Sequence, residues 1–96
     1  MDRLWIVEIE LNKGRHDVVG VFDSYQKAVQ EMKNDYKAET CKHLVKFYKI
    51  GPCVPGKLIR NQTEDECPGY ERWIPTKKGK FIIEGALDRE VFGNRN

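Results

Sequence analysis

Residues 20–32, with the sequence GVFDSYQKAVQEM, join the end of a predicted strand to the start of a predicted helix. The valine and phenylalanine at the start of this segment favour a β-strand. Asp23 or Ser24 can accept a hydrogen bond from the first free N–H groups of a helix, and Gln26 follows Asp23 at the spacing of a capping box. The sequence therefore predicts a helix that begins here and runs to about residue 38 or 39.

The predicted helix is amphipathic, because its apolar side chains recur every three or four residues. These side chains are Tyr25, Ala28, Val29, Met32 and Tyr36. Polar residues occupy most of the remaining positions, so the helix has one apolar stripe and one solvated face. We expect the apolar stripe to cover one face of a β-sheet.

The chain before the helix has the pattern of a β-hairpin. Residues 4–11 (LWIVEIEL) are apolar on one face throughout, which is typical of a central strand. That face consists of Trp5, Val7, Ile9 and Leu11. Residues 12–17 form a predicted turn, and residues 18–22 return as the partner strand.

The chain after the helix is predicted to contain two regular strands and an insertion. The strands are residues 44–50, in which Val45 and Phe47 share one face, and residues 80–85. Prolines and glycines interrupt residues 51–79 between them. Short strands are expected inside this insertion and a brief helical turn after the last strand, at residues 57–60, 70–74 and 86–92.

These patterns predict a single domain over residues 1–96 with an α+β fold. We expect a small antiparallel sheet of three to five strands (ββαβ…β), with one main helix packed on one face and residues 51–79 as a β-rich loop insertion. Short sheets in small proteins leave exposed edges, which can pair with a second chain. The sequence therefore favours a homo-oligomer.

The composition restricts the classes of function. The chain has 96 residues and a formal net charge of +2, from 17 basic and 15 acidic residues. Because this charge is balanced, recognition of phosphate would need a local cluster of cations. No stretch approaches the roughly 20 apolar residues of a membrane span, and the first residues do not have the pattern of a secretory signal. With three cysteines and no disulfide framework, we expect a protein of the reducing cytoplasm.

Three short motifs resemble those of a family of small phage and bacterial proteins of unknown function. They are an opening strand (WIVE, residues 5–8), a GVFDS segment followed by Lys27 and Ala28, and an FII strand (residues 81–83) that leads to Leu87 and Asp88. The motifs cover roughly the first third and the last sixth of the chain, and residues 41–79 are longer than the link expected in the family. The resemblance implies a phage origin and an accessory role in the host cell, such as antagonism of antiviral defence. It implies no catalytic residues.

A cluster of aromatic and basic residues in and after the insertion is the strongest candidate site. Its members are Tyr70, Arg72, Trp73, Lys77, Lys78 and Lys80. Aromatic rings stack on bases and cations hold phosphates, so the cluster suits a nucleotide or a single-stranded nucleic acid. The same residue types also dominate protein interfaces. A third interpretation is that the rings pack the insertion onto the sheet while the lysines are a solvated edge.

The cysteines and histidines offer a weaker candidate for metal binding or catalysis. Cys41, His43, Cys53 and Cys67 could supply four soft ligands, but they lack the paired C-x-x-C spacing of zinc fingers. A cysteine nucleophile at position 53 or 67, assisted by His16 or His43, would be the only route to an enzyme. The chain has no recognised catalytic motif or glycine-rich phosphate loop, so we expect a non-enzymatic protein without a cofactor.

Two functional hypotheses follow. The first is a phage accessory protein that binds a small phosphorylated ligand, a nucleotide-type signal, through the six residues of the cluster. The second is direct inhibition of a host protein through the aromatic side chains of the insertion or through an exposed strand edge.

Overall fold

The protein folds as one five-stranded antiparallel sheet with a single α-helix on one face. The structure is a computed structural model that describes residues 3–56 and 69–85. The elements in chain order are β1 (Leu4–Leu11), the 3-10 turn η1 (Asn12–Gly14), β2 (His16–Phe22), α1 (Tyr25–Ala38), the 3-10 turn η2 (Lys42–Leu44), β3 (Val45–Cys53), β4 (Glu71–Pro75) and β5 (Phe81–Gly85). The strand order is β2-β1-β3-β4-β5, with every neighbouring pair antiparallel. The predicted α+β class is therefore confirmed.

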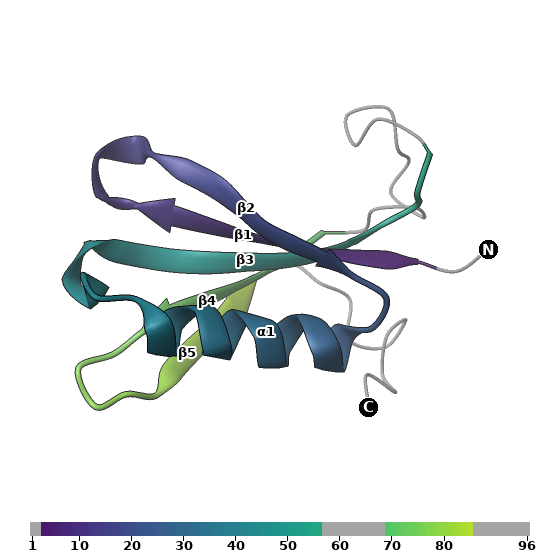
Figure 1. Ribbon diagram of the computed structural model, residues 1–96. Helices are drawn as coiled ribbons and strands as arrows, with labels where there is room; N and C mark the ends of the chain where they lie inside the picture. The colour runs from purple at the N-terminus through teal and green to yellow at the C-terminus, as the bar shows by residue number, and fades with distance from the viewer. Residues whose placement is uncertain (1–2, 57–68, 86–96) are drawn as a thin grey trace.

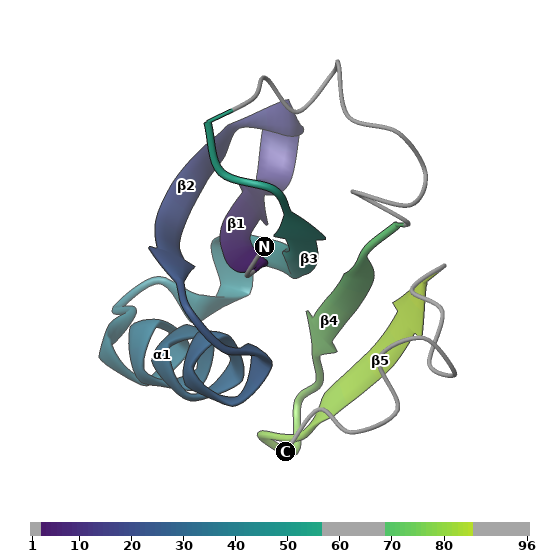
Figure 2. The ribbon, with the colours of Figure 1, turned by 90° about the vertical axis from the view of Figure 1, so that its right-hand side faces the viewer.

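The helix covers only part of the sheet. Figure 1 shows α1 running alongside the strands on one side of the sheet. Figure 2 shows the sheet curving past the helix, so that β4 and β5 extend beyond it. The closest neighbours of α1 are β2, β1 and β3. Side chains of α1, β4 and β5 line a pocket on this side of the sheet.

Ser24 begins the helix. Its side chain accepts a hydrogen bond from the backbone N–H of Lys27 at 3.1 Å, and its backbone is extended as an N-cap requires. At the other end, the N–H of Glu39 donates to the carbonyl oxygen of Tyr36 at 3.1 Å. The predicted helix is confirmed at both ends, and Ser24 is the cap among the two candidates.

The core lies between α1 and the helix-facing side of the sheet. Alternate residues of each strand point to the same face, so the predicted apolar face of β1 meets the helical stripe. The buried apolar core consists of Trp5, Val7, Ile9, Ala28, Met32, Val45, Tyr48, Ile50 and Trp73. Tyr25 packs edge-on against Trp5, with 5.2 Å between ring centroids.

Two buried polar contacts tie the helix to strands. Glu71 is only 2% exposed, and its carboxylate accepts a hydrogen bond from the Tyr25 hydroxyl at 2.5 Å. The Tyr48 hydroxyl donates to the Asp35 carboxylate at 2.7 Å. Burial and this carboxylate raise the pKa of Tyr48 above its ordinary value. The first contact joins the start of α1 to β4, and the second joins its third turn to β3.

Strand β3 differs from the prediction at both ends. It begins at Val45 rather than at residue 44, and it continues through Pro52 to Cys53. Pro52 has no N–H to donate to a neighbouring strand. It is tolerated in β3 because β4 pairs with β3 only from Tyr48 to Ile50, so β4 does not need a hydrogen bond from Pro52. Residues 51–53 of the predicted insertion are thus part of the sheet, as is β4.

The expectation that Val45 and Phe47 share one face of β3 is wrong. Val45 is buried in the core, whereas Phe47 lies on the face opposite to the helix. A register shift between Glu10 and Leu11 in the pairing of β1 with β3 accounts for the difference. The expected strand at 57–60 and the expected helical turn at 86–92 lie outside the described residues.

Candidate ligand-binding site

The structure divides the predicted six-residue cluster between three places. Trp73 and Lys80 lie on the helix side of the sheet. Tyr70 and Arg72 lie on the opposite side, because neighbouring residues of a strand point to opposite faces. Lys77 and Lys78 lie in the turn between β4 and β5. The six residues therefore do not form one pocket, and ligand binding by the set stays a prediction.

Trp73 and Lys80 belong to a groove between α1 and the β4–β5 hairpin, which we call the α1–β5 groove. It has a volume of about 640 Å³. Its lining residues are Lys33, Tyr36, Lys37, Lys42, Trp73, Gly79, Lys80, Phe81 and Ile83. The groove thus combines four lysines with three aromatic rings.

The rings form the base of the groove. Phe81 lies edge-on to Tyr36 and to Trp73, at centroid distances of 5.3 Å and 5.9 Å. Trp73 is 7% exposed, whereas Tyr36 and Phe81 are each partly exposed. The indole Nε1 of Trp73 is buried and has no hydrogen-bond partner among the described residues. Tyr36 and Phe81 therefore offer the accessible ring surface, and Trp73 supports it from below.

The lysines surround these rings, and none of them forms an ion pair with an acidic residue that the structure describes. Lys33 Nζ lies 5.8 Å from the centroid of the Trp73 ring, and Lys42 Nζ lies 5.4 Å from that of Tyr36. The ion pairs found between described residues lie elsewhere, at Glu10–Lys46 and at Arg72–Glu84. The carboxylates of Asp35 and Glu39 lie near the groove rings, because both act on Tyr48, which packs against Tyr36 and Phe81. Within the described residues neither forms an ion pair with a groove lysine, so an anion in the groove would meet four lysines against two carboxylates.

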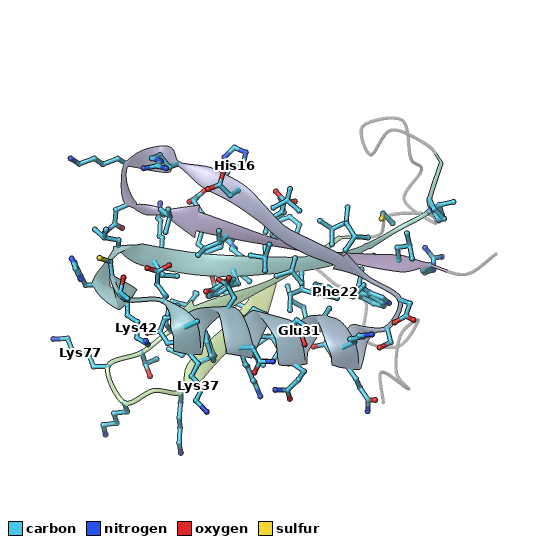
Figure 3. All side chains as sticks on the ribbon, in the orientation of Figure 1. His16, Phe22, Glu31, Lys37, Lys42 and Lys77 are labelled. Atoms are coloured by element: carbon cyan, nitrogen blue, oxygen red, sulfur yellow. The ribbon has the colours of Figure 1, made fainter. Side chains whose placement is uncertain are left out.

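Local structure explains why the lysines face the groove. Lys33 and Lys37 are four residues apart and lie on one side of α1, with Tyr36 between them. The Lys42 ammonium group is fixed at the end of the helix, where it donates to the carbonyl oxygens of Lys37 at 3.3 Å and Glu39 at 2.7 Å. Figure 3 shows Lys37 and Lys42 near the carboxyl end of the helix.

The β4–β5 turn holds the fourth lysine. The N–H and the hydroxyl of Thr76 both donate to the carbonyl oxygen of Lys80, at 2.9 Å and 2.6 Å. Gly79 has a φ of +78°, a conformation in which glycine meets no steric cost. These contacts close a tight turn and place Lys80 and Phe81 against the groove.

Sequence reasoning missed the helical half of the groove. The sequence pattern assigns Lys33 to the solvated helix face and Tyr36 to the apolar stripe that covers the sheet, and it does not single out Lys37. Their spacing is a usable signal, because two lysines four residues apart beside an aromatic side chain make one basic and aromatic surface. This surface lies beside Lys80 only because of the strand order, which brings together residues that are far apart in the chain.

The face of the sheet opposite to the helix, which we call the open face, has different chemistry. It contains a shallow pocket of about 620 Å³ with both acidic and basic side chains. The lining residues are Glu8, Ile9, Glu10, His16, Lys46, Phe47, Lys49, Tyr70, Arg72 and Ile74.

Many charges of the open face have partners within it. Lys49 Nζ lies 4.5 Å from the centroid of Tyr70, and the Arg72 guanidinium lies 5.4 Å from that of Phe47. Arg72 also pairs with Glu84 at 3.9 Å. This mixture of rings, arginine and balanced charge is more typical of a protein interface than of an anion site.

The candidate metal and cysteine sites find little support in the described residues. Cys41 is exposed and Cys53 is buried, and Cys67 lies outside the described residues. The described part of the chain contains no group of three or more histidine, cysteine, aspartate or glutamate residues placed to hold a metal ion. His43 lies in η2, which follows directly after Cys41.

One pairing proposed for a cysteine nucleophile, Cys53 with His16, can be checked because the structure describes both residues. Cys53 pairs with Leu4 at one end of the sheet, whereas His16 pairs with Glu10, which pairs with Phe47. Six residues of β3 separate these positions, which is about 20 Å along a strand. His16 is therefore not placed to activate Cys53.

Comparison with known proteins gives no match, either to a family model, to a curated protein or to a solved structure. Among the described residues, α1 is too short and too polar to span a membrane.

Proposed function

We propose that the protein is a non-enzymatic binding protein that holds a phosphorylated, nucleotide-type ligand in the α1–β5 groove. The observation that supports this proposal is the convergence of four lysines on the rings of Tyr36, Trp73 and Phe81. In the biological setting that the family resemblance implies, the protein is a phage accessory protein of the host cytoplasm. Capture of a nucleotide signal would then antagonise a host process such as antiviral defence.

The groove offers separate contacts for the two parts of a nucleotide. A base can lie on the accessible surfaces of Tyr36 and Phe81, because every base has a π face that stacks on aromatic rings. Each stacked base contributes roughly 1–3 kcal/mol in proteins that bind single strands. Lys33, Lys37 and Lys80 have no carboxylate partner among the described residues, so their ammonium groups are available to phosphate oxygens.

A titration of the purified protein by isothermal calorimetry tests the proposal. The ligands are nucleoside monophosphates, cyclic mononucleotides, cyclic dinucleotides and the matching nucleosides without phosphate. We expect at least one phosphorylated ligand to bind, its nucleoside to bind much more weakly, and raised salt to weaken the binding. The variant Lys37→Gln/Lys80→Gln should reduce the affinity at least tenfold.

Lys27→Gln is the matched control, because Lys27 is an exposed lysine of the same helix that does not line the groove. Lys42 is unsuitable for this test, since its ammonium group also caps the helix. If no phosphorylated ligand of the panel binds, or if the Lys37→Gln/Lys80→Gln variant binds as tightly as the Lys27→Gln control, the proposal is wrong.

A second candidate function is inhibition of a host protein through the open face. Tyr70 and Arg72 of the predicted cluster lie there beside Phe47. Exposed apolar side chains extend this face, including Val18 at 62% and Ile82 at 56% exposure. Retention of one host protein by the native chain, lost in Tyr70→Ala but kept in Lys37→Gln, would favour this function over ligand capture.

Self-association is part of both proposals. The sheet ends in two edge strands, β2 and β5, and unpaired edges can join copies of the same chain. Native mass spectrometry of the purified protein measures the subunit number, and a monomer at micromolar concentration would contradict a stable homo-oligomer.

A further inference from the structure

Positive charge collects at one end of the molecule, which we call the basic end. Figure 1 shows that the tip of the β1–β2 hairpin, the carboxyl end of α1, η2 and the β4–β5 turn all lie at this end. The hairpin tip and η2 are joined by a hydrogen bond from Asn12 Nδ2 to the carbonyl oxygen of His43 at 3.3 Å. The cations contributed by these segments are Lys13, Arg15, Lys37, Lys42, Lys77, Lys78 and Lys80.

Little negative charge opposes these cations. The acidic residues of the same segments and their flanks are Glu10, Asp17, Asp35 and Glu39, against seven cations. Glu10 pairs with Lys46 at 3.4 Å, Asp35 accepts a hydrogen bond from the Tyr48 hydroxyl at 2.7 Å, and the Glu39 carboxylate accepts one from the backbone N–H of Cys41 at 3.0 Å. None of the basic-end cations takes part in the ion pairs found between described residues. A chain with a formal net charge of only +2 thus has a strongly polarised surface.

The α1–β5 groove opens within this basic end. Lys37, Lys42 and Lys80 line the groove, whereas Lys77 and Lys78 do not, although they precede Lys80 by three and two residues. A mononucleotide confined to the groove would leave these two lysines unused. Only a ligand that continues out of the groove with further phosphates would reach them.

We infer that the ligand class of the groove is a single-stranded nucleic acid, with one unpaired base on the groove rings and the following phosphates on Lys77 and Lys78. This inference rests on the proposed function and specifies the ligand of the same site. An unpaired strand is required because a base in a duplex cannot present its face to Tyr36 and Phe81. Rings for bases and a cationic track for the backbone are the combination that single-strand binding uses.

Fluorescence anisotropy with a labelled oligothymidylate of about ten nucleotides tests the inference. Competition by unlabelled oligothymidylate and by thymidine monophosphate compares the strand with its single unit. We expect the strand to bind at least tenfold more tightly than the monophosphate. The logarithm of the binding constant for the strand should fall linearly with the logarithm of salt concentration, with a slope of about −0.7 per contacted phosphate.

The variant Lys77→Gln/Lys78→Gln separates the basic end from the groove. It should weaken strand binding and reduce the magnitude of the salt slope by about 1.4, while thymidine monophosphate binding is unchanged. Lys27→Glu is the control with the same change of net charge, because Lys27 lies outside the basic end and lines neither pocket. We expect its salt slope to match that of the native protein.

The outcomes distinguish the inference from the proposed function. If the strand binds no more tightly than the monophosphate, or if Lys77→Gln/Lys78→Gln and the Lys27→Glu control have the same salt slope, the inference is wrong while nucleotide binding stands. If the strand binds through Lys77 and Lys78 but Lys37→Gln/Lys80→Gln has no effect on any ligand, the groove function is wrong and the basic end alone holds the strand.

Discussion

Loss of the Tyr25 hydroxyl is expected to destabilise the fold, because it removes a hydrogen bond from a buried carboxylate. Tyr25 is the first residue of α1, and its hydroxyl donates to Glu71, which is 2% exposed at the start of β4. Tyr25→Phe keeps the ring and its edge-on contact with Trp5, so the change is confined to the hydroxyl group. A hydrogen bond to a charged group contributes roughly 1.5–3 kcal/mol to stability.

We therefore predict that Tyr25→Phe lowers the free energy of unfolding by about 2 kcal/mol. In a domain of this size, that loss lowers the melting temperature by roughly 8–16 °C. Urea unfolding at neutral pH, followed by circular dichroism, measures the loss. A double-mutant cycle with Glu71→Gln isolates the contribution of the pair, since Glu71 has other contacts.

The control for this experiment is Tyr70→Phe, which removes a hydroxyl from an exposed tyrosine of the open face and should change stability by less than about 0.5 kcal/mol. The reasoning is refuted if Tyr25→Phe is as stable as the control, or if the coupling energy with Glu71 is zero.

Two further predictions concern stability. Burial and the Asp35 carboxylate raise the pKa of Tyr48 in the folded state. The contribution of the neutral Tyr48 hydroxyl to the free energy of unfolding is therefore complete below the ordinary tyrosine pKa of about 10 and is lost as the pH rises above that value. The urea midpoint of the native protein should therefore fall more steeply above pH 10 than that of Tyr48→Phe, and parallel curves would contradict this. Gly85→Ala should be more destabilising than Gly79→Ala, because a Cβ at Gly85 would clash with the Tyr70 carbonyl oxygen whereas one at Gly79 meets nothing within 4 Å. Equal melting temperatures of the two variants would argue against this packing.

The sequence predicts the fold well where local patterns decide the structure. Trp5, Val7 and Ile9 alternate with less buried residues, and their face is the one that α1 covers. The helical stripe and the cap at Ser24 are equally local features. Strand β3 was predicted less well, because the position of Pro52 is acceptable only beside a strand that ends early, and no local signal shows this.

The candidate site was only partly predictable. Arg72 and Trp73 are neighbours in the sequence, but a strand sends them to opposite faces of the sheet. Lys80 lines the same groove as Lys33 and Lys37 because the strand order places the β4–β5 hairpin beside the helix, and this is a consequence of topology. Composition identified the basic and aromatic residue types, and the three-dimensional arrangement selects which of them act together.

The claim that the α1–β5 groove binds the ligand is tested most directly by locating bound nucleotide on the protein. The two tryptophans give two indole N–H signals in a two-dimensional nitrogen–proton spectrum, with Trp73 lining the groove and Trp5 in the core away from it. On titration with thymidine monophosphate, we predict that the Trp73 indole signal and the backbone signals of Lys37 and Lys80 shift together and saturate, while the Trp5 indole signal stays in place. Saturable shifts confined to Phe47 and Tyr70 on the open face, or no shifts at all, would contradict the account.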